Sequence, residues 1–245
     1  GAPDGNCLAM CHSGTHALNA GLLGLLTPGD HVLTTATEHN SVLRPLAAQQ
    51  QSGSIAISSV PCDATGVADV AAARELLHSQ TRMIVVGHAS NVTGAVADLA
   101  AWSDLAIEAG AMLLVDASQT LGYLPIDVQR LRIDVLAAAG HKGLRGLAGT
   151  AILYVAPELQ SQLRPIMWGG TGLSSELVDS GMGWPHSVEV GNLNLPGVCH
   201  WERQVNEEVK RLRKTREKEK CSMGKCFLSG VGASSSRENA SEVSL

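Results

Sequence analysis

The sequence has 245 residues, of which 44% are hydrophobic and 17% are charged, as is typical of one large globular domain or of one domain with an appendage. Its formal charge of −5 is uneven, because residues 201–245 carry ten basic and seven acidic side chains, whereas residues 1–200 carry eight and sixteen. An acidic body argues against a nucleic-acid-binding protein, since binding to phosphates needs clustered basic groups.

The six cysteines are irregularly spaced, and no two are separated by the two-residue gap of a redox or zinc motif. This pattern argues against a disulfide framework and predicts a reducing, cytoplasmic setting. The first residues show no basic leader followed by an apolar core, and no run reaches the roughly 18 apolar residues that span a bilayer. We therefore expect no membrane partner.

Strands and helices alternate along the first part of the chain. Short apolar runs closed by polar or glycine residues predict strands over residues 31–37, 54–61, 83–89, 111–117, 135–140 and 150–155. Helix-like stretches lie over residues 16–26, 40–51, 67–79 and 99–110, and the last of them ends in glycine, as a helix C-cap would. This order predicts an α/β fold, with a mostly parallel sheet and helices on both faces.

The character of the sequence changes near Cys199. We expect one domain over residues 1–198, followed over residues 199–245 by a charged helix and a disordered tail rich in serine and glycine. Residues 210–220 are basic, but Glu217 and Glu219 interrupt them, which favours a solvated segment over a nucleic-acid site.

Polar side chains follow several of the predicted strands. These are Glu38-His39-Asn40, the segment SNVTG at 90–94, Asp116 with Gln119, and His141-Lys142. In parallel α/β sheets, ligands bind where loops leave the carboxyl ends of the strands. An amine, a carboxylate, an imidazole and two amides would thus meet at one edge of the sheet.

These groups, and the motifs that the sequence lacks, restrict the kind of site that the chain could form. The sequence lacks the GxGxxG of a dinucleotide site, a P-loop, the HExxH of a zinc protease and the GxSxG of a serine hydrolase. We therefore expect none of these functions, and we predict no metal site. Pyridoxal phosphate needs an amine for a Schiff base and a carboxylate that keeps its ring nitrogen protonated, and Lys142 and Asp116 fit these tasks. The alternatives are a solvated loop for Lys142 and a helix N-cap for Asp116. Ser13-Gly14-Thr15 would offer N–H groups to a phosphate, or would simply cap a helix.

Five segments resemble the cysteine desulfurase family, within the class V aminotransferase group of pyridoxal-phosphate enzymes. They are SGTHALNAGLLGLLTPGDHVLTTATEHNSVLRPL, HASNVTGAV, LLVDASQTLGYLPIDV, DVLAAAGHKGLRGLAGTAILYV and WGGTGLSSE. They occur in the family's order over roughly residues 10–198, and GHKG after VDASQ is specific. The resemblance implies the large domain of a fold-type I pyridoxal-phosphate enzyme.

The resemblance also implies roles around the cofactor ring. Lys142 would form the internal aldimine and move the α proton of the substrate. His39 would stack on the ring and act as an acid or base. Asp116 would pair with the ring nitrogen, Gln119 would bond the ring hydroxyl, and Asn91 would lie near that hydroxyl and the substrate carboxylate.

Further residues would hold the cofactor phosphate. The resemblance assigns Gly14 and Thr15 to a phosphate cradle, His141 to its surroundings, and Thr171 to the phosphate of a second subunit in a homodimer. Family members carry serine or threonine at the position of Ala139, so one phosphate hydroxyl would be missing here.

The implied reaction converts cysteine to alanine and transfers sulfur to an enzyme thiol, with a sulfur acceptor protein as a further partner. The resemblance also implies a chain truncated at both ends, without the small C-terminal domain that bears the nucleophilic cysteine and the arginine that binds the substrate. We assign that thiol role to none of Cys199, Cys221 and Cys226. Two alternatives stay open: a fragment that binds the cofactor without turnover, and an aminotransferase or lyase acting on another amino acid.

Overall fold

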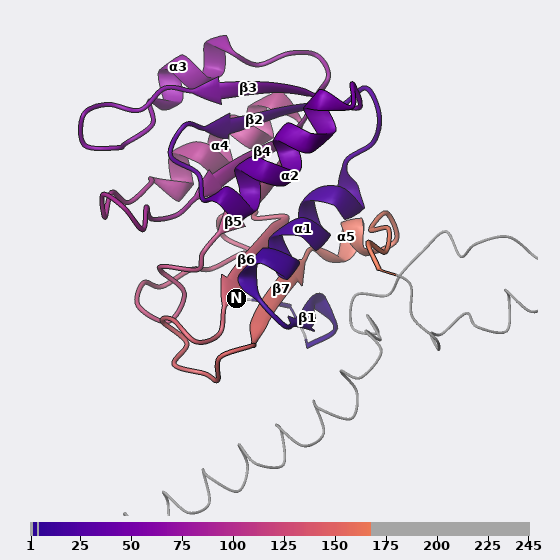
Figure 1. Ribbon diagram of the computed structural model, residues 1–245. Helices are drawn as coiled ribbons and strands as arrows, with labels where there is room; N and C mark the ends of the chain where they lie inside the picture. Colours follow the sequence, from indigo (N-terminus) through magenta and orange to yellow (C-terminus); the bar gives the residue numbers. More distant parts are fainter. Residues whose placement is uncertain (1, 4, 168–245) are drawn as a thin grey trace, which may run out of the picture. The chain divides into compact units, whose positions relative to one another are not determined.

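A seven-stranded sheet organises residues 2, 3 and 5–167, which are the residues that the computed structural model describes (Figure 1). The strands are β1 (Leu8–Cys11), β2 (His31–Thr35), β3 (Ala56–Val60), β4 (Thr81–Gly87), β5 (Met112–Asp116), β6 (Val135–Ala139) and β7 (Ala151–Val155). Their order across the sheet is β1-β7-β6-β5-β4-β2-β3.

Six of these strands run in the same direction. β3, β2, β4, β5 and β6 pair parallel to their neighbours, whereas β7 pairs antiparallel with both β6 and β1. Because β7 is antiparallel to both, β1 has the direction of β6. The predicted mostly parallel sheet is confirmed, and the loops that follow these six strands leave the sheet at one edge.

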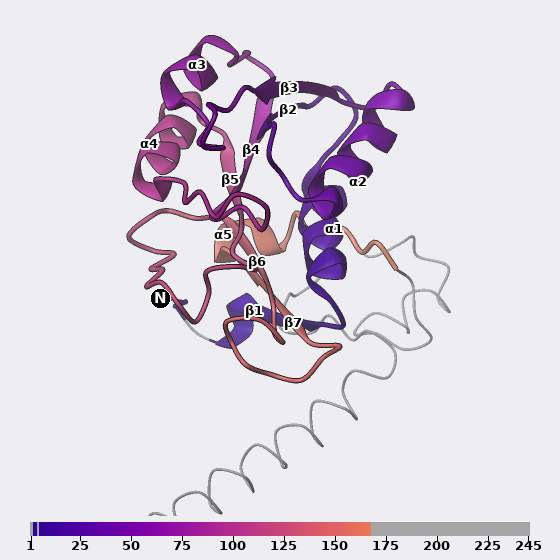
Figure 2. The same ribbon diagram turned by 60° about the vertical axis from the view of Figure 1, so that its left-hand side comes forward.

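Helices cover both faces of the sheet, as predicted. They are α1 (Gly14–Leu25), α2 (Asn40–Gln51), α3 (Val70–Glu75), α4 (Leu99–Ala109) and the short α5 (Pro157–Gln160). Figure 2 shows α1 and α2 on one side of the strands and α3 and α4 on the other. The central strands are apolar on both sides: Met83 and Val85 of β4 pack in the core under α1 and α2, and Ile84 and Val86 in the core under α3 and α4.

Side-chain caps define where the helices begin. The Ser13 side chain accepts the His16 N–H and starts α1, and the Asp98 side chain accepts the N–H groups of Ala100 and Ala101 and starts α4. Gly110, in the left-handed region at φ 63°, ends α4 where the sequence predicts a C-cap.

Some predicted boundaries are wrong. Residues 67–79 do not form one helix, because Asp63 accepts the N–H groups of Thr65 and Val67 in a tight turn, and α3 begins only after its cap, Asp69. The strand β1, the 3-10 turn Gly5–Cys7 and α5 were not predicted. β1 has only four residues and no alternating pattern, and it is a strand because the edge of β7 pairs with it.

Within the part of the chain that the structure describes, no helix has the length and apolar character needed to cross a membrane.

Candidate active site

A cavity of about 280 Å³ lies at the edge of the sheet where the parallel strands end. Its walls include loops that follow β1, β2, β3, β4, β5 and β6. Eight of the nine predicted site residues line it: Gly14, Thr15, His39, Asn91, Asp116, Gln119, His141 and Lys142. The ninth, Thr171, lies outside the described residues.

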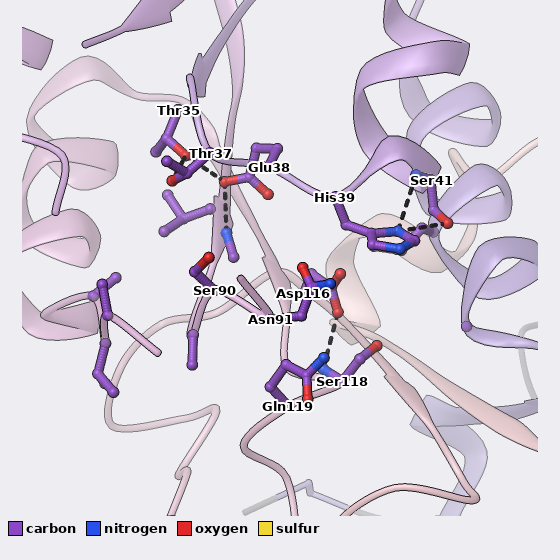
Figure 3. Close-up of a pocket in the computed structure, with 18 of the residues that line it drawn as sticks. Thr35, Thr37, Glu38, His39, Ser41, Ser90, Asn91, Asp116, Ser118 and Gln119 are labelled. Carbon is purple, nitrogen blue, oxygen red and sulfur yellow. Dashed lines mark hydrogen bonds between the residues drawn. The ribbon is translucent and has the colours of Figure 1, made fainter. Parts of the chain in front are cut away.

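Asp116 is the last residue of β5, and it pairs with Gly87 at the end of β4. Only 9% of the residue is exposed, and its Oδ1 accepts the Ser118 N–H at 2.9 Å (Figure 3). The side chain therefore caps the turn that follows the strand and also borders the cavity. The helix N-cap considered for Asp116 is wrong, because a turn and not a helix follows β5. Capping this turn occupies one carboxylate oxygen.

His39 caps α2 and borders the cavity. Its Nδ1 accepts the backbone N–H of Ser41 at 3.1 Å and lies 2.9 Å from the Ser41 hydroxyl (Figure 3). Because Nδ1 acts as an acceptor, the neutral ring carries its proton on Nε2. Ser41 thereby orients a ring that sequence analysis had selected, although Ser41 itself was not selected.

The Ser41 hydroxyl also reaches the first turn of α1. It lies 2.7 Å from the Thr15 hydroxyl, across a separation of 26 positions in the sequence. The start of α1 and the imidazole of His39 are thus joined by one hydroxyl. The sequence offers only a weak signal for this link, namely a serine two positions after a histidine in a loop.

The start of α1 is open to the cavity, which Ser13, Gly14 and Thr15 line. A Cβ atom on Gly14 would lie 3.3 Å from the Ser118 hydroxyl and 3.4 Å from the Ala139 methyl group. The backbone N–H groups of Gly14 and Thr15 belong to the first helical turn, which has no carbonyl partners within the helix. The Ser118 hydroxyl and the Ala139 methyl group thus both lie close to Gly14.

Lys142 lies in the turn after β6 and is the only lysine in residues 1–209. Its carbonyl accepts the Arg145 N–H at 2.9 Å, and Gly146 donates to the Gly140 carbonyl at 2.7 Å. A Cβ atom on Gly140 would collide with the Thr150 hydroxyl. The turn that presents the amine is therefore compact, and it requires glycine at position 140.

Glu38 is a cavity residue that sequence analysis placed in a loop but did not select as a site residue. Its Oε1 accepts the Thr35 hydroxyl at 2.8 Å and the Gly87 N–H at 2.7 Å (Figure 3). Burial, with a smaller contribution from the charge of Asp116, raises the pKa of this carboxyl to about 7 despite both hydrogen bonds. The only signal in the sequence was its position directly before His39.

None of the cysteines in the described residues lines the cavity. Cys7 and Cys11 are buried, and burial raises the pKa of the Cys11 thiol to about 12, which disfavours a nucleophilic thiolate. Cys62 is partly exposed, and its sulfur lies 3.5 Å from the Thr37 hydroxyl. Among the described residues there is no group of three or more His, Cys, Asp or Glu side chains that could hold a metal ion.

The chain is similar to known proteins. The model of the family Aminotransferase class-V matches residues 1–206. A probable cysteine desulfurase of Methanothermobacter thermautotrophicus is 34% identical over 172 residues, which cover 69% of this chain and 42% of that protein. The cysteine desulfurase CsdA of Escherichia coli is 35% identical over 176 residues, or 71% of this chain and 43% of CsdA.

Solved structures share the fold. The crystal structure of E. coli CsdA matches with a TM-score of 0.64 over 69% of this chain and 43% of that chain, at 34% identity. A C-DES variant solved with glycine covalently linked to its PLP cofactor matches with a TM-score of 0.66, at 26% identity, over 77% of this chain and 50% of that one. The chain spans about two fifths of the length of the curated relatives described above.

Proposed function

Because this chain belongs to the aminotransferase class-V family, whose members use pyridoxal phosphate, we propose that it binds this cofactor in the cavity and performs chemistry of the cysteine desulfurase type. The observation that carries the proposal is the convergence of eight predicted residues on one cavity. They lie at or after the ends of five different strands, so their meeting depends on the whole sheet.

The residues present fit the cofactor. The start of α1, where Gly14 and Thr15 line the cavity, suits a phosphate, because unpaired N–H groups and the helix dipole favour an anion. Buried Asp116 suits a protonated ring nitrogen, and Lys142 suits an aldehyde. These three requirements are met on different walls of the same cavity.

Three side chains of the cavity would have different roles toward the bound cofactor. When bound, pyridoxal phosphate supplies an aldehyde carbon that condenses with amines and a ring that withdraws electrons from the substrate α carbon. Asp116 would keep the proton on the ring nitrogen, and Lys142 would hold the cofactor and move the proton at the α carbon. His39, held by Ser41 with its proton on Nε2, would lie against the ring face.

Asn91, Gln119 and His141 would complete the site. The first two are amides in loops after β4 and β5. Gln119 would hydrogen-bond the ring hydroxyl, and Asn91 would lie near that hydroxyl and the substrate carboxylate. His141 precedes the lysine and would lie near the phosphate. We propose cysteine as the substrate because the relatives are cysteine desulfurases. A homodimer, a sulfur acceptor protein, the cytoplasmic setting and a domain boundary after residue 198 stay predictions.

The cofactor assignment is tested by spectroscopy and peptide mapping. Purified protein mixed with pyridoxal phosphate is expected to develop an absorbance band near the visible edge, which is lost in Lys142→Ala and kept in Lys210→Ala. Reduction with borohydride should then fix the cofactor on the peptide that contains Lys142, which is the only lysine before position 210. Labelling confined to the lysines at 210 and beyond would overturn the assignment.

The reaction is tested by product analysis. With cysteine and a dithiol, the proposal predicts alanine and sulfide in equal amounts, since the dithiol reduces the transferred sulfur and is itself oxidised to a disulfide. Release of a keto acid would instead indicate an aminotransferase or lyase. A Lys142-dependent absorbance band without any product would indicate that residues 1–245 bind the cofactor but do not complete turnover.

A further inference from the structure

Glu38 is the buried carboxyl of the cavity to which the proposed function gives no task. It lies in the turn between β2 and α2, and its Oε1 accepts hydrogen bonds from Thr35 of β2 and Gly87 of β4. Gly87 pairs with Asp116 across the β4–β5 ladder, so the carboxyl lies over the strand end next to Asp116. Two acidic side chains therefore share one wall of the cavity.

The second oxygen of Glu38 has no hydrogen-bond partner among the described residues. Oε2 is buried, and the residue is only 7% exposed. A Cβ atom on residue 87 would lie 3.2 Å from Oε2, so the glycine there leaves room for the carboxyl. A buried carboxylate oxygen without a partner is costly, whereas the neutral acid avoids most of that cost.

The charges around the Glu38 carboxyl also favour its neutral form. Asp116, from β5, is the charged group that acts on it, and its negative charge disfavours a second one. The other titratable residues that line the cavity are His39 on the same turn and His141 and Lys142 after β6. Burial and Asp116 together raise the pKa of Glu38 to about 7. Near neutral pH, a change in its surroundings can therefore change its protonation.

We propose that Glu38 is a positioning residue of the cofactor site, which holds a proton in the free protein and releases it when a cationic ring docks against Asp116. The inference rests on the proposed function, because the ring is that of pyridoxal phosphate. Glu38 would release its proton because a positive ring nitrogen offsets the negative charge of Asp116, so that Glu38 ionises more readily. The two hydrogen bonds to Oε1 keep the carboxyl in place in both states.

Calorimetry in buffers of different ionisation enthalpy measures this proton release. Wild-type protein titrated with pyridoxal phosphate near pH 7 is expected to release up to about 0.5 proton more per site than Glu38→Gln, which keeps the shape and the acceptor oxygen but cannot titrate. The difference should disappear at about pH 5 and about pH 9, where Glu38 has the same charge before and after binding. Glu75→Gln, which removes an exposed carboxyl, should match the wild type.

Equal proton release in wild type and Glu38→Gln at every pH would overturn the inference, as would a relative uptake of protons by the wild type. Failure of the proposed function looks different, since neither protein would then bind pyridoxal phosphate or develop the absorbance band. Should Glu38→Gln not fold, carbon-13 spectra of wild-type protein labelled on glutamate carboxyls provide the test. A carboxyl that titrates near pH 7 without cofactor, and at lower pH with it, is the expected result.

Discussion

At the scale of single residues, Glu38 and Asp116 show how the same functional group acquires different surroundings within one cavity. Asp116 accepts a hydrogen bond from the Ser118 N–H through one oxygen, and it lines the cavity. Glu38 has one oxygen with two partners and one with none in the described structure. The unpartnered oxygen makes Glu38 the carboxyl whose ionisation costs folding energy.

This cost predicts a pH-dependent stability. The pKa of Glu38 rises from an ordinary 4.5 to about 7 in the folded protein. Its stabilising contribution is therefore fully present below pH 4.5 and is lost as the pH rises through 7. Between about pH 5 and about pH 8, the free energy of unfolding of the wild type should fall relative to Glu38→Gln, by of the order of 3 kcal/mol.

Urea denaturation of both proteins without cofactor, at the two pH values, checks this prediction. Glu75→Gln serves as the control, because its carboxyl is exposed. The prediction fails if Glu38→Gln and the wild type change in parallel over the whole pH range.

At the scale of elements, local sequence patterns located the central strands and the long helices. The strands β4, β5 and β6 are apolar runs buried on both faces, and such runs stand out in any sequence. The predicted helix over residues 99–110 matches α4 to within one residue. Short elements such as β1 were missed, because four residues without alternation carry too little local information.

The cap of α4 offers a test at this scale. Asp98→Ala removes the acceptor for the N–H groups of Ala100 and Ala101, and should cost about 1 kcal/mol of unfolding free energy. Asp98→Asn should restore most of this loss, because asparagine also caps helices well. Asp104→Ala, on the exposed side of the same helix, is the matched control and should change stability by less than about 0.5 kcal/mol. Thermal or urea denaturation distinguishes these outcomes.

At the scale of the whole molecule, the cavity depends on the long-range order of the sheet. Its walls come from loops spread over residues 13–142, and these loops meet because six strands point to the same edge. A ligand that contacts several of these loops binds the folded chain and not the unfolded one. Binding must therefore stabilise the whole described fold.

Pyridoxal phosphate should consequently raise the melting temperature. At a free concentration of about 100 times its Kd, the expected gain is about 2.7 kcal/mol. Pyridoxal, which lacks the phosphate, should give a smaller shift at the same concentration, because it leaves the open start of α1 unused. Differential scanning calorimetry compares the two. Equal shifts would mean that Gly14 and Thr15 do not hold the phosphate.

The sequence by itself determined the class of the fold, and eight of the nine site residues predicted from it line the cavity. Strand and helix preferences depend on residues a few positions apart, and loops after parallel strands must meet at one edge, so Asp116, His39 and Lys142 could be selected in advance. Only the tertiary structure decided the antiparallel pairing of β7, the Ser41 bridge to Thr15 and the burial of Glu38. These features join residues far apart in the chain, as Glu38 and Gly87 are at 49 positions, and burial or hydrogen bonding at that range has no local pattern.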